Sequence, residues 1–92
     1  MSDEEHAATE KVVGKVTHYF GRIEVGAIEL TDTLRVGDTV RFKGSTTDFT
    51  QTVDSMQIEN EAVQEATAGQ VIGVKVAERV REGDQVLLVS EG

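Results

Sequence analysis

The chain of 92 residues contains no cysteine and no proline, and 17 acidic against 9 basic residues give it a formal charge of −8. This length supports one domain with one core, and the absence of cysteine excludes disulfides and thiolate metal sites. The negative field of the whole chain does not attract a polyanion, so any contact with RNA requires a local basic patch.

The N-terminal segment, residues 1–11, is predicted to be a disordered acidic tail in front of a single β-domain over residues 12–90. Asp3, Glu4, Glu5 and Glu10 supply four of the seventeen acids, and no apolar pattern accompanies them. The segment has neither the basic start of a signal peptide nor the apolar run of a membrane anchor. We therefore expect a cytoplasmic protein without membrane contact.

Strand signals begin after this tail. The first spans residues 12–20, and regular alternation there predicts one inward face formed by Val12, Val16, His18 and Phe20. The second spans residues 22–30, where the apolar phase changes at Gly26 and Ala27. Such a change of phase predicts a β-bulge, which restores the inward direction of the following side chains.

Shorter strands are predicted over the rest of the chain. Residues 39–43 point Val40 and Phe42 inward, and residues 49–59 change phase near Asp54 and Ser55, which predicts a second bulge. Residues 60–69 are acidic and rich in alanine and are expected to form a loop anchored by Val63 and Ala66. Residues 72–76 alternate cleanly, and residues 85–90 read as a strand covered on both faces.

Two segments, residues 34–42 and 80–88, share one pattern in which Arg-x-Gly-Asp precedes an apolar strand. Gly37 and Gly83 stand where a turn needs a positive φ, which glycine adopts without a Cβ clash. Short strands at intervals of roughly ten residues, with bulges and glycine turns, are typical of small barrels. The sequence therefore predicts an all-β fold, a small closed antiparallel β-barrel of six to seven strands.

The sequence resembles two known kinds of β-domain. Residues 21–26, 34–40, 53–58, 68–74 and 81–84 resemble the second domain of translational GTPases such as elongation factor Tu. Residues 16–20, 43–49 and 51–59 resemble more closely the C-terminal accessory barrel of the collagenase-like peptidases, a family that includes enzymes needed for tRNA hydroxylation. Both resemblances imply a barrel of the translation-protein type, and fold alone does not imply function.

No catalytic or metal-binding pattern is apparent in the sequence. A phosphate loop needs Gly-Lys-Ser or Gly-Lys-Thr, but Gly14-Lys15 is followed by Val16 and lacks the earlier glycine. His6 and His18 have no cysteine nearby for a zinc site, and no serine stands in a nucleophile elbow. We predict a protein that is not an enzyme and that uses no metal, nucleotide or other cofactor.

The predicted binding surface combines cations, a stacking ring and hydroxyl groups, which suit phosphates and 2′-hydroxyls of RNA. Its residues are Lys15, His18, Tyr19, Arg41, Lys43, Thr46 and Thr47. The simpler interpretation is that Arg41 and Lys43 form a solvated strand face and that His18 and Tyr19 cover the barrel mouth. A second cluster, Lys75, Arg79 and Arg81, is expected to be neutralised by the neighbouring acids.

Three functions remain open from the sequence. The first is a stand-alone module that contacts tRNA or ribosomal RNA, which the resemblance to elongation factor Tu implies. The second is a protein-interaction module that docks onto a separately encoded peptidase-like or tRNA-modifying enzyme domain. The third is a barrel that only stabilises a homodimer. Salt discriminates among them, because phosphate contacts weaken steeply with ionic strength and apolar docking does not.

Overall fold

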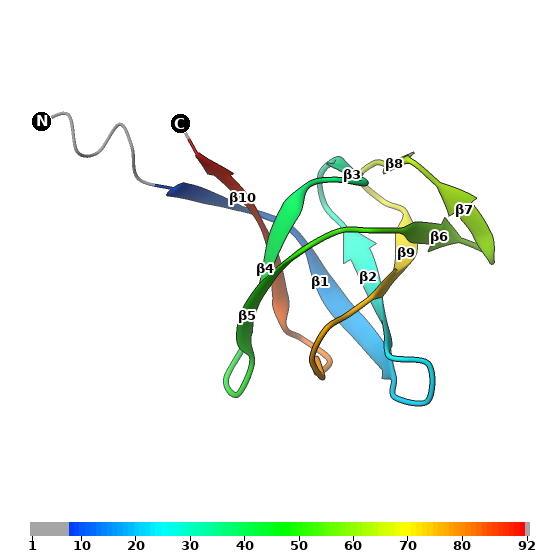
Figure 1. The fold of residues 1–92 in the computed structure, drawn as a ribbon, viewed down its shortest axis with the longest axis horizontal. Helices are drawn as coiled ribbons and strands as arrows, with labels where there is room; N and C mark the ends of the chain where they lie inside the picture. Colours follow the sequence, from blue (N-terminus) through cyan, green and yellow to red (C-terminus); the bar gives the residue numbers. More distant parts are fainter. Residues whose placement is uncertain (1–7, 92) are drawn as a thin grey trace, which may run out of the picture.

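The computed structural model describes residues 8–91, and this range is entirely β-structure and turns, with no helix. Figure 1 shows the strands wrapped around one core. The ten strands are Ala8–Phe20 (β1), Val25–Leu30 (β2), Leu34–Arg35 (β3), Thr39–Lys43 (β4), Asp48–Thr52 (β5), Met56–Ile58 (β6), Glu61–Val63 (β7), Glu65–Ala66 (β8), Val71–Lys75 (β9) and Gln85–Glu91 (β10).

Eight of these strands form one antiparallel sheet in the order β5-β4-β10-β1-β2-β9-β6-β7, and β3 pairs separately with β8. The order has two ends, at β5 and β7, so the hydrogen-bonded ladder does not close on itself. The all-β prediction is confirmed, whereas the predicted closure is not. The number of strands also exceeds the six to seven expected, because several segments predicted as loops or long strands form short separate ones.

A side chain bridges the opening between β5 and the end of β9. The Gln51 Nε2 donates to the carbonyl of Lys75 at 2.8 Å, and its Oε1 accepts from the amide of Ala77 at 2.7 Å. One primary amide thus satisfies a backbone acceptor and a backbone donor, as a neighbouring strand would. The curled sheet is joined at this point by a side chain instead of a ladder.

The two Arg-x-Gly-Asp segments form the same turn, as predicted. Gly37 and Gly83 have φ of 100° and 92°, the left-handed values that the third residue of a type II turn requires. In each turn the aspartate amide donates to the arginine carbonyl at 3.1 Å, and the aspartate carboxylate accepts from the arginine amide at 2.9 Å. The glycine amide of each turn donates to the carbonyl of a buried valine, Val53 or Val16, at 2.8 Å.

The core confirms some predicted strand faces and corrects others. Val40 and Phe42 are buried, as predicted, and so are Ala66 and the alternating residues of β9. The strand β2 alternates regularly through Gly26, Ile28 and Leu30, so the bulge predicted within it is wrong. The register of the pairing between β1 and β2 changes on β1 instead, where Val16 pairs with Ile28 but His18 pairs with Ala27. The second bulge predicted near Asp54 and Ser55 is a break between β5 and β6.

The N-terminal boundary also differs from the prediction. Residues 8–11 belong to β1 and pair with residues 88–91 of β10, so the domain begins four residues earlier than expected. Residues 1–7 of the predicted tail lie outside the described residues. The pairing of β1 with β10 explains why the two ends of the described chain lie side by side in Figure 1.

Candidate functional site

The structure brings together some of the residues predicted to bind RNA. Lys15 on β1 and Lys43 on β4 both pair in register with Gln85 on β10, so they lie two strands apart in one row on the outer face. Both lysines are exposed, as is Thr46. Thr47 is buried, with an exposed fraction of 5%. The prediction that the Thr47 hydroxyl contacts RNA is therefore corrected.

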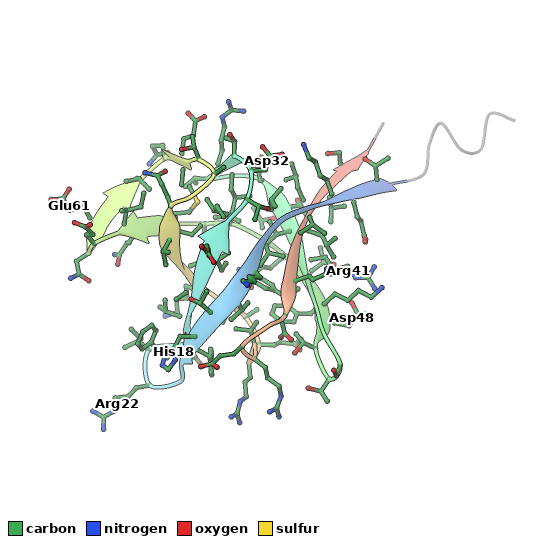
Figure 2. The ribbon with its side chains drawn as sticks, turned by 180° about the vertical axis from the view of Figure 1, so that it is seen from behind. His18, Arg22, Asp32, Arg41, Asp48 and Glu61 are labelled. Atoms are coloured by element: carbon green, nitrogen blue, oxygen red, sulfur yellow. The ribbon has the colours of Figure 1, made fainter. Side chains whose placement is uncertain are left out.

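Arg41 is held by two carboxylates. Its Nε and Nη2 donate to the two carboxylate oxygens of Asp48, both at 2.7 Å, and its Nη1 donates to Glu10 at 3.0 and 3.2 Å. Hydrogen bonds to Asp48 and then Glu10 raise the pKa of Arg41, and the hydrogen bonds from Arg41 lower the pKa of Asp48. Figure 2 shows Arg41 directed at Asp48. Most of its donors are occupied, which leaves little of this guanidinium for a phosphate.

This ion pair makes stability depend on acid pH. Because the pKa of Asp48 is lowered in the folded state, its ionised carboxylate stabilises the fold at pH values above the ordinary aspartate pKa of about 3.9. This contribution is lost as the pH falls through the lowered pKa. The difference in unfolding free energy between the wild type and Asp48→Asn is therefore expected to be constant above about pH 5 and to shrink below about pH 4. Urea denaturation at a series of pH values measures it. A difference that persists undiminished far below pH 4 would contradict this account.

His18 does not lie on the apolar side of β1. The change of register after Val16 turns it outward, and its Nδ1 lies 3.3 Å from the Glu82 carboxylate. Its ring meets the edge of Phe20, with centroids 4.5 Å apart. Tyr19 is half-buried and packs against the core. The prediction of an inward His18 is wrong because a bulge reverses the alternation on which it rested.

An apolar groove lies on the outer face of β2 and β9 and was not predicted. Three of the four large hydrophobic side chains exposed in residues 8–91 line it: Phe20, Ile23 and Val71, which are 46%, 59% and 52% exposed. The groove has a volume of about 360 Å³. Val25, Ala27, Ile72 and Gly73 also line it. Scattered exposed hydrophobic residues need no explanation, but a contiguous group marks a candidate interaction site.

A tight turn borders this groove. Glu59 and Asn60, which join β6 to β7, line the groove and have φ of 52° and 69°. Ile58 pairs with Glu61 across them, so they are the two central residues of a hairpin turn with left-handed backbone. This conformation is unfavourable for glutamate, and such strain is often found beside functional surfaces. The groove therefore has a polar, acidic rim on the side of β6 and β7.

In the part of the chain that the structure describes, no group of three histidine, cysteine, aspartate or glutamate side chains is close enough to hold a metal ion. No helix of the described residues is long and apolar enough to span a membrane. A serine or threonine nucleophile needs a base such as histidine within hydrogen-bond reach. Among the hydrogen bonds of residues 8–91, no serine or threonine hydroxyl reaches His18, which contacts Glu82 and Phe20.

The fold is that of the C-terminal domain of a protein from Geobacillus thermoleovorans assigned to the U32 peptidases. The crystal structure of that domain aligns with 85% of this chain and 91% of its own with a TM-score of 0.80, at 21% sequence identity. Its selenomethionine variant aligns with 83% of this chain and 96% of its own, with a TM-score of 0.79 and 22% identity. At this identity the likeness shows the fold alone.

Sequence relatives come from the same kind of protein. The chain is 40% identical over 80 residues to an uncharacterised protease of Methanocaldococcus jannaschii, covering 86% of the chain and 20% of that protein. It is 36% identical over 83 residues to a collagenase of Porphyromonas gingivalis, covering 87% of the chain and 20% of the collagenase. No family model matches the sequence. The chain thus spans about one fifth of the length of the curated relatives it matches.

These comparisons confirm one resemblance and leave the other without support. The chain is similar to one domain of collagenase-like proteases and U32 peptidases, as its residues 16–20, 43–49 and 51–59 predicted. The resemblance to the second domain of elongation factor Tu is not confirmed.

Proposed function

We propose that this chain is a non-catalytic accessory domain that docks onto a peptidase-like catalytic domain through its apolar groove. The observation that carries the proposal is the gathering of Phe20, Ile23 and Val71 in one groove. The relatives support it, because they are proteases of which this chain matches only about a fifth. In such a protein, an exposed apolar groove offers a surface on which the remaining part can pack.

Energetics favour a docked state for this groove. Burying a side chain such as isoleucine or valine contributes about 1.5 to 3 kcal/mol, and these side chains are about half exposed in the isolated domain. Docking would recover the remaining part of that energy for each of them. The acidic rim at Glu59 adds orientation more than affinity, because charges at the edge of an interface contribute little.

The sequence-based preference for RNA has weaker support from the geometry. Of its predicted ligands, Arg41 is engaged by Asp48 and Glu10, and Thr47 is buried. Lys15, Lys43 and Thr46 remain exposed, but Lys15 pairs in register with Glu29 and Lys43 with Asp48, on a chain of net charge −8. Docking onto a protein, the second of the three functions that the sequence left open, is therefore preferred here.

Binding in solution tests the proposal. The partner is the Porphyromonas gingivalis collagenase from which the segment matching this chain has been deleted, titrated with this chain by calorimetry. We expect association that persists in high salt, and we expect Ile23→Ser combined with Val71→Ser to weaken it by roughly 30- to 100-fold. Both side chains lie at the surface, so the variant should fold as the wild type does.

Two controls make the result interpretable. The collagenase's own excised segment, added back, establishes that the deleted protein is competent to bind. Val12→Ser removes the fourth exposed hydrophobic side chain, which is 43% exposed and does not line the groove. Equal losses of affinity in the Val12 variant and in the groove variant would show that the groove has no specific role.

A further inference from the structure

The basic residues fall into two groups, those that form ion pairs and those that do not. Lys11, Arg35 and Arg41 form ion pairs with Asp32, Glu65 and the pair Glu10 and Asp48. The other six form no ion pair with any carboxylate of residues 8–91, and we refer to them as the basic end: Lys15, Arg22, Lys43, Lys75, Arg79 and Arg81.

The fold explains why these six residues lie at one end. The end of β1, the start of β2, and the ends of β4 and β9 meet there, because the pairings place Val25 opposite Lys75 and Lys43 opposite Gln85. Figure 2 shows Arg22 and His18 at this end and Asp32 at the other. Among residues 8–91, the basic side chains without an ion pair thus lie in one region.

Arg79 and Arg81 are the centre of this region. Val80 between them is buried, whereas both arginines are exposed. Together with His18, Tyr19 and Glu82 they line a hollow of about 320 Å³.

No ion pair of residues 8–91 joins Arg79 or Arg81 to the neighbouring acids Glu78, Glu82 and Asp84. The Glu82 carboxylate lies against the His18 Nδ1. Asp84 is buried, and its carboxylate accepts the amide hydrogen of Arg81 to close the turn. Both guanidinium groups are left with their donors facing solvent. Guanidinium groups in this state bind carboxylates or phosphates through paired hydrogen bonds.

The width of the site favours a short acidic peptide over a nucleic acid. Glu78 and Glu82 flank the two arginines in sequence, so the positive tract along this segment is two residues wide. A short acidic peptide can present two carboxylates, one to each of the two arginines. A nucleic acid strand would continue its phosphates past the arginines toward the flanking glutamates, against the negative field of the whole chain.

We infer that the basic end is a second interaction surface, which binds an extended acidic segment of a protein through Arg79 and Arg81. It adjoins the apolar groove at residues 21–24, where Arg22 belongs to the basic end and Ile23 to the groove. The partner docked in the groove would therefore present acidic residues beside its apolar contact. Only this last assignment rests on the proposed function.

A model peptide tests the inference without the catalytic domain. The probe is a short synthetic peptide with two glutamates separated by one valine, added to isotope-labelled full chain at low ionic strength. We expect amide shifts at residues 18–19 and 79–82, and we expect them to fade as the salt concentration is raised. The double variant Arg79→Gln with Arg81→Gln should bind the peptide at least about fivefold more weakly than the wild type. Arg35→Gln, an arginine with an ion pair at the opposite end, is expected to bind like the wild type.

The remaining arms separate the possible outcomes. The groove variant Ile23→Ser with Val71→Ser should bind the peptide normally, so failure of groove docking leaves this result intact. The inference is overturned if the peptide causes no shift at low salt, if its diglutamine counterpart causes the same shifts, or if the double arginine variant binds unchanged. If a short RNA oligonucleotide bound more tightly than the peptide, the ligand of the basic end would be a nucleic acid and not an acidic protein segment.

Discussion

Phe42→Ala is expected to lower the free energy of unfolding by about 3 to 5 kcal/mol, a large part of the stability of a small domain. Phe42 is fully buried at the centre of the core. Its ring stacks on Phe49 of the adjacent strand, with centroids 5.0 Å apart and planes at 26°. Alanine would leave a cavity that rigid neighbouring strands cannot fill, and would remove the stacking contact.

Urea denaturation measures this loss, with Phe20→Ala as the matched control. Phe20 is the same residue type but is 46% exposed, so its replacement should cost no more than about 1 kcal/mol. If the two alanine variants were equally stable, the assignment of Phe42 to the core would be wrong.

Gly44→Ala is expected to destabilise the fold by about 2 to 3 kcal/mol through a steric conflict. A methyl group on residue 44 would overlap the Asp84 carboxylate, whose Cγ would lie 2.7 Å away. Asp84 cannot easily move, because it is buried and its carboxylate closes the second Arg-x-Gly-Asp turn. The substitution therefore strains two loops at once.

The control for this substitution is Gly21→Ala. A methyl group there would meet only the Tyr19 ring, at an ordinary contact distance of 3.4 Å, so stability should change by less than about 0.5 kcal/mol. Thermal unfolding of both variants measures the difference. Normal stability of Gly44→Ala would mean that Asp84 does not hold the position described.

Parts of the fold are readable from local sequence. The two Gly-Asp turns and the inward residues of residues 39–43 follow from turn chemistry and from regular alternation, and the structure confirms both. The predicted inward position of His18 failed because one extra residue on β1 reverses the phase of everything after it. The sequence predicted a closed barrel, but the hydrogen-bonded ladder is open, because closure depends on how far the sheet curls; the side chain of Gln51 bridges the opening instead.

The candidate sites were less predictable than the fold. Lys15 and Lys43 were expected on one surface and do share a row across β1, β10 and β4. Arg41 was expected to be available, but its carboxylate partners Glu10 and Asp48 are 31 and 7 residues away and meet it only through strand pairing. The sequence pattern predicts that Phe20, Ile23 and Val71 are core residues or parts of strands. Their exposure on one groove is a property of the folded sheet.

The most direct test of the account places a photo-crosslinking benzophenone side chain at position 23 of this chain. Mixed with the collagenase that lacks the matching segment, and illuminated, this variant is expected to crosslink to the collagenase in high yield. The same group at Thr50, on the outer face of β5 and away from the groove, should crosslink weakly. Equal crosslinking from both positions, or none from position 23 when the collagenase's own segment still binds, would contradict docking through the groove.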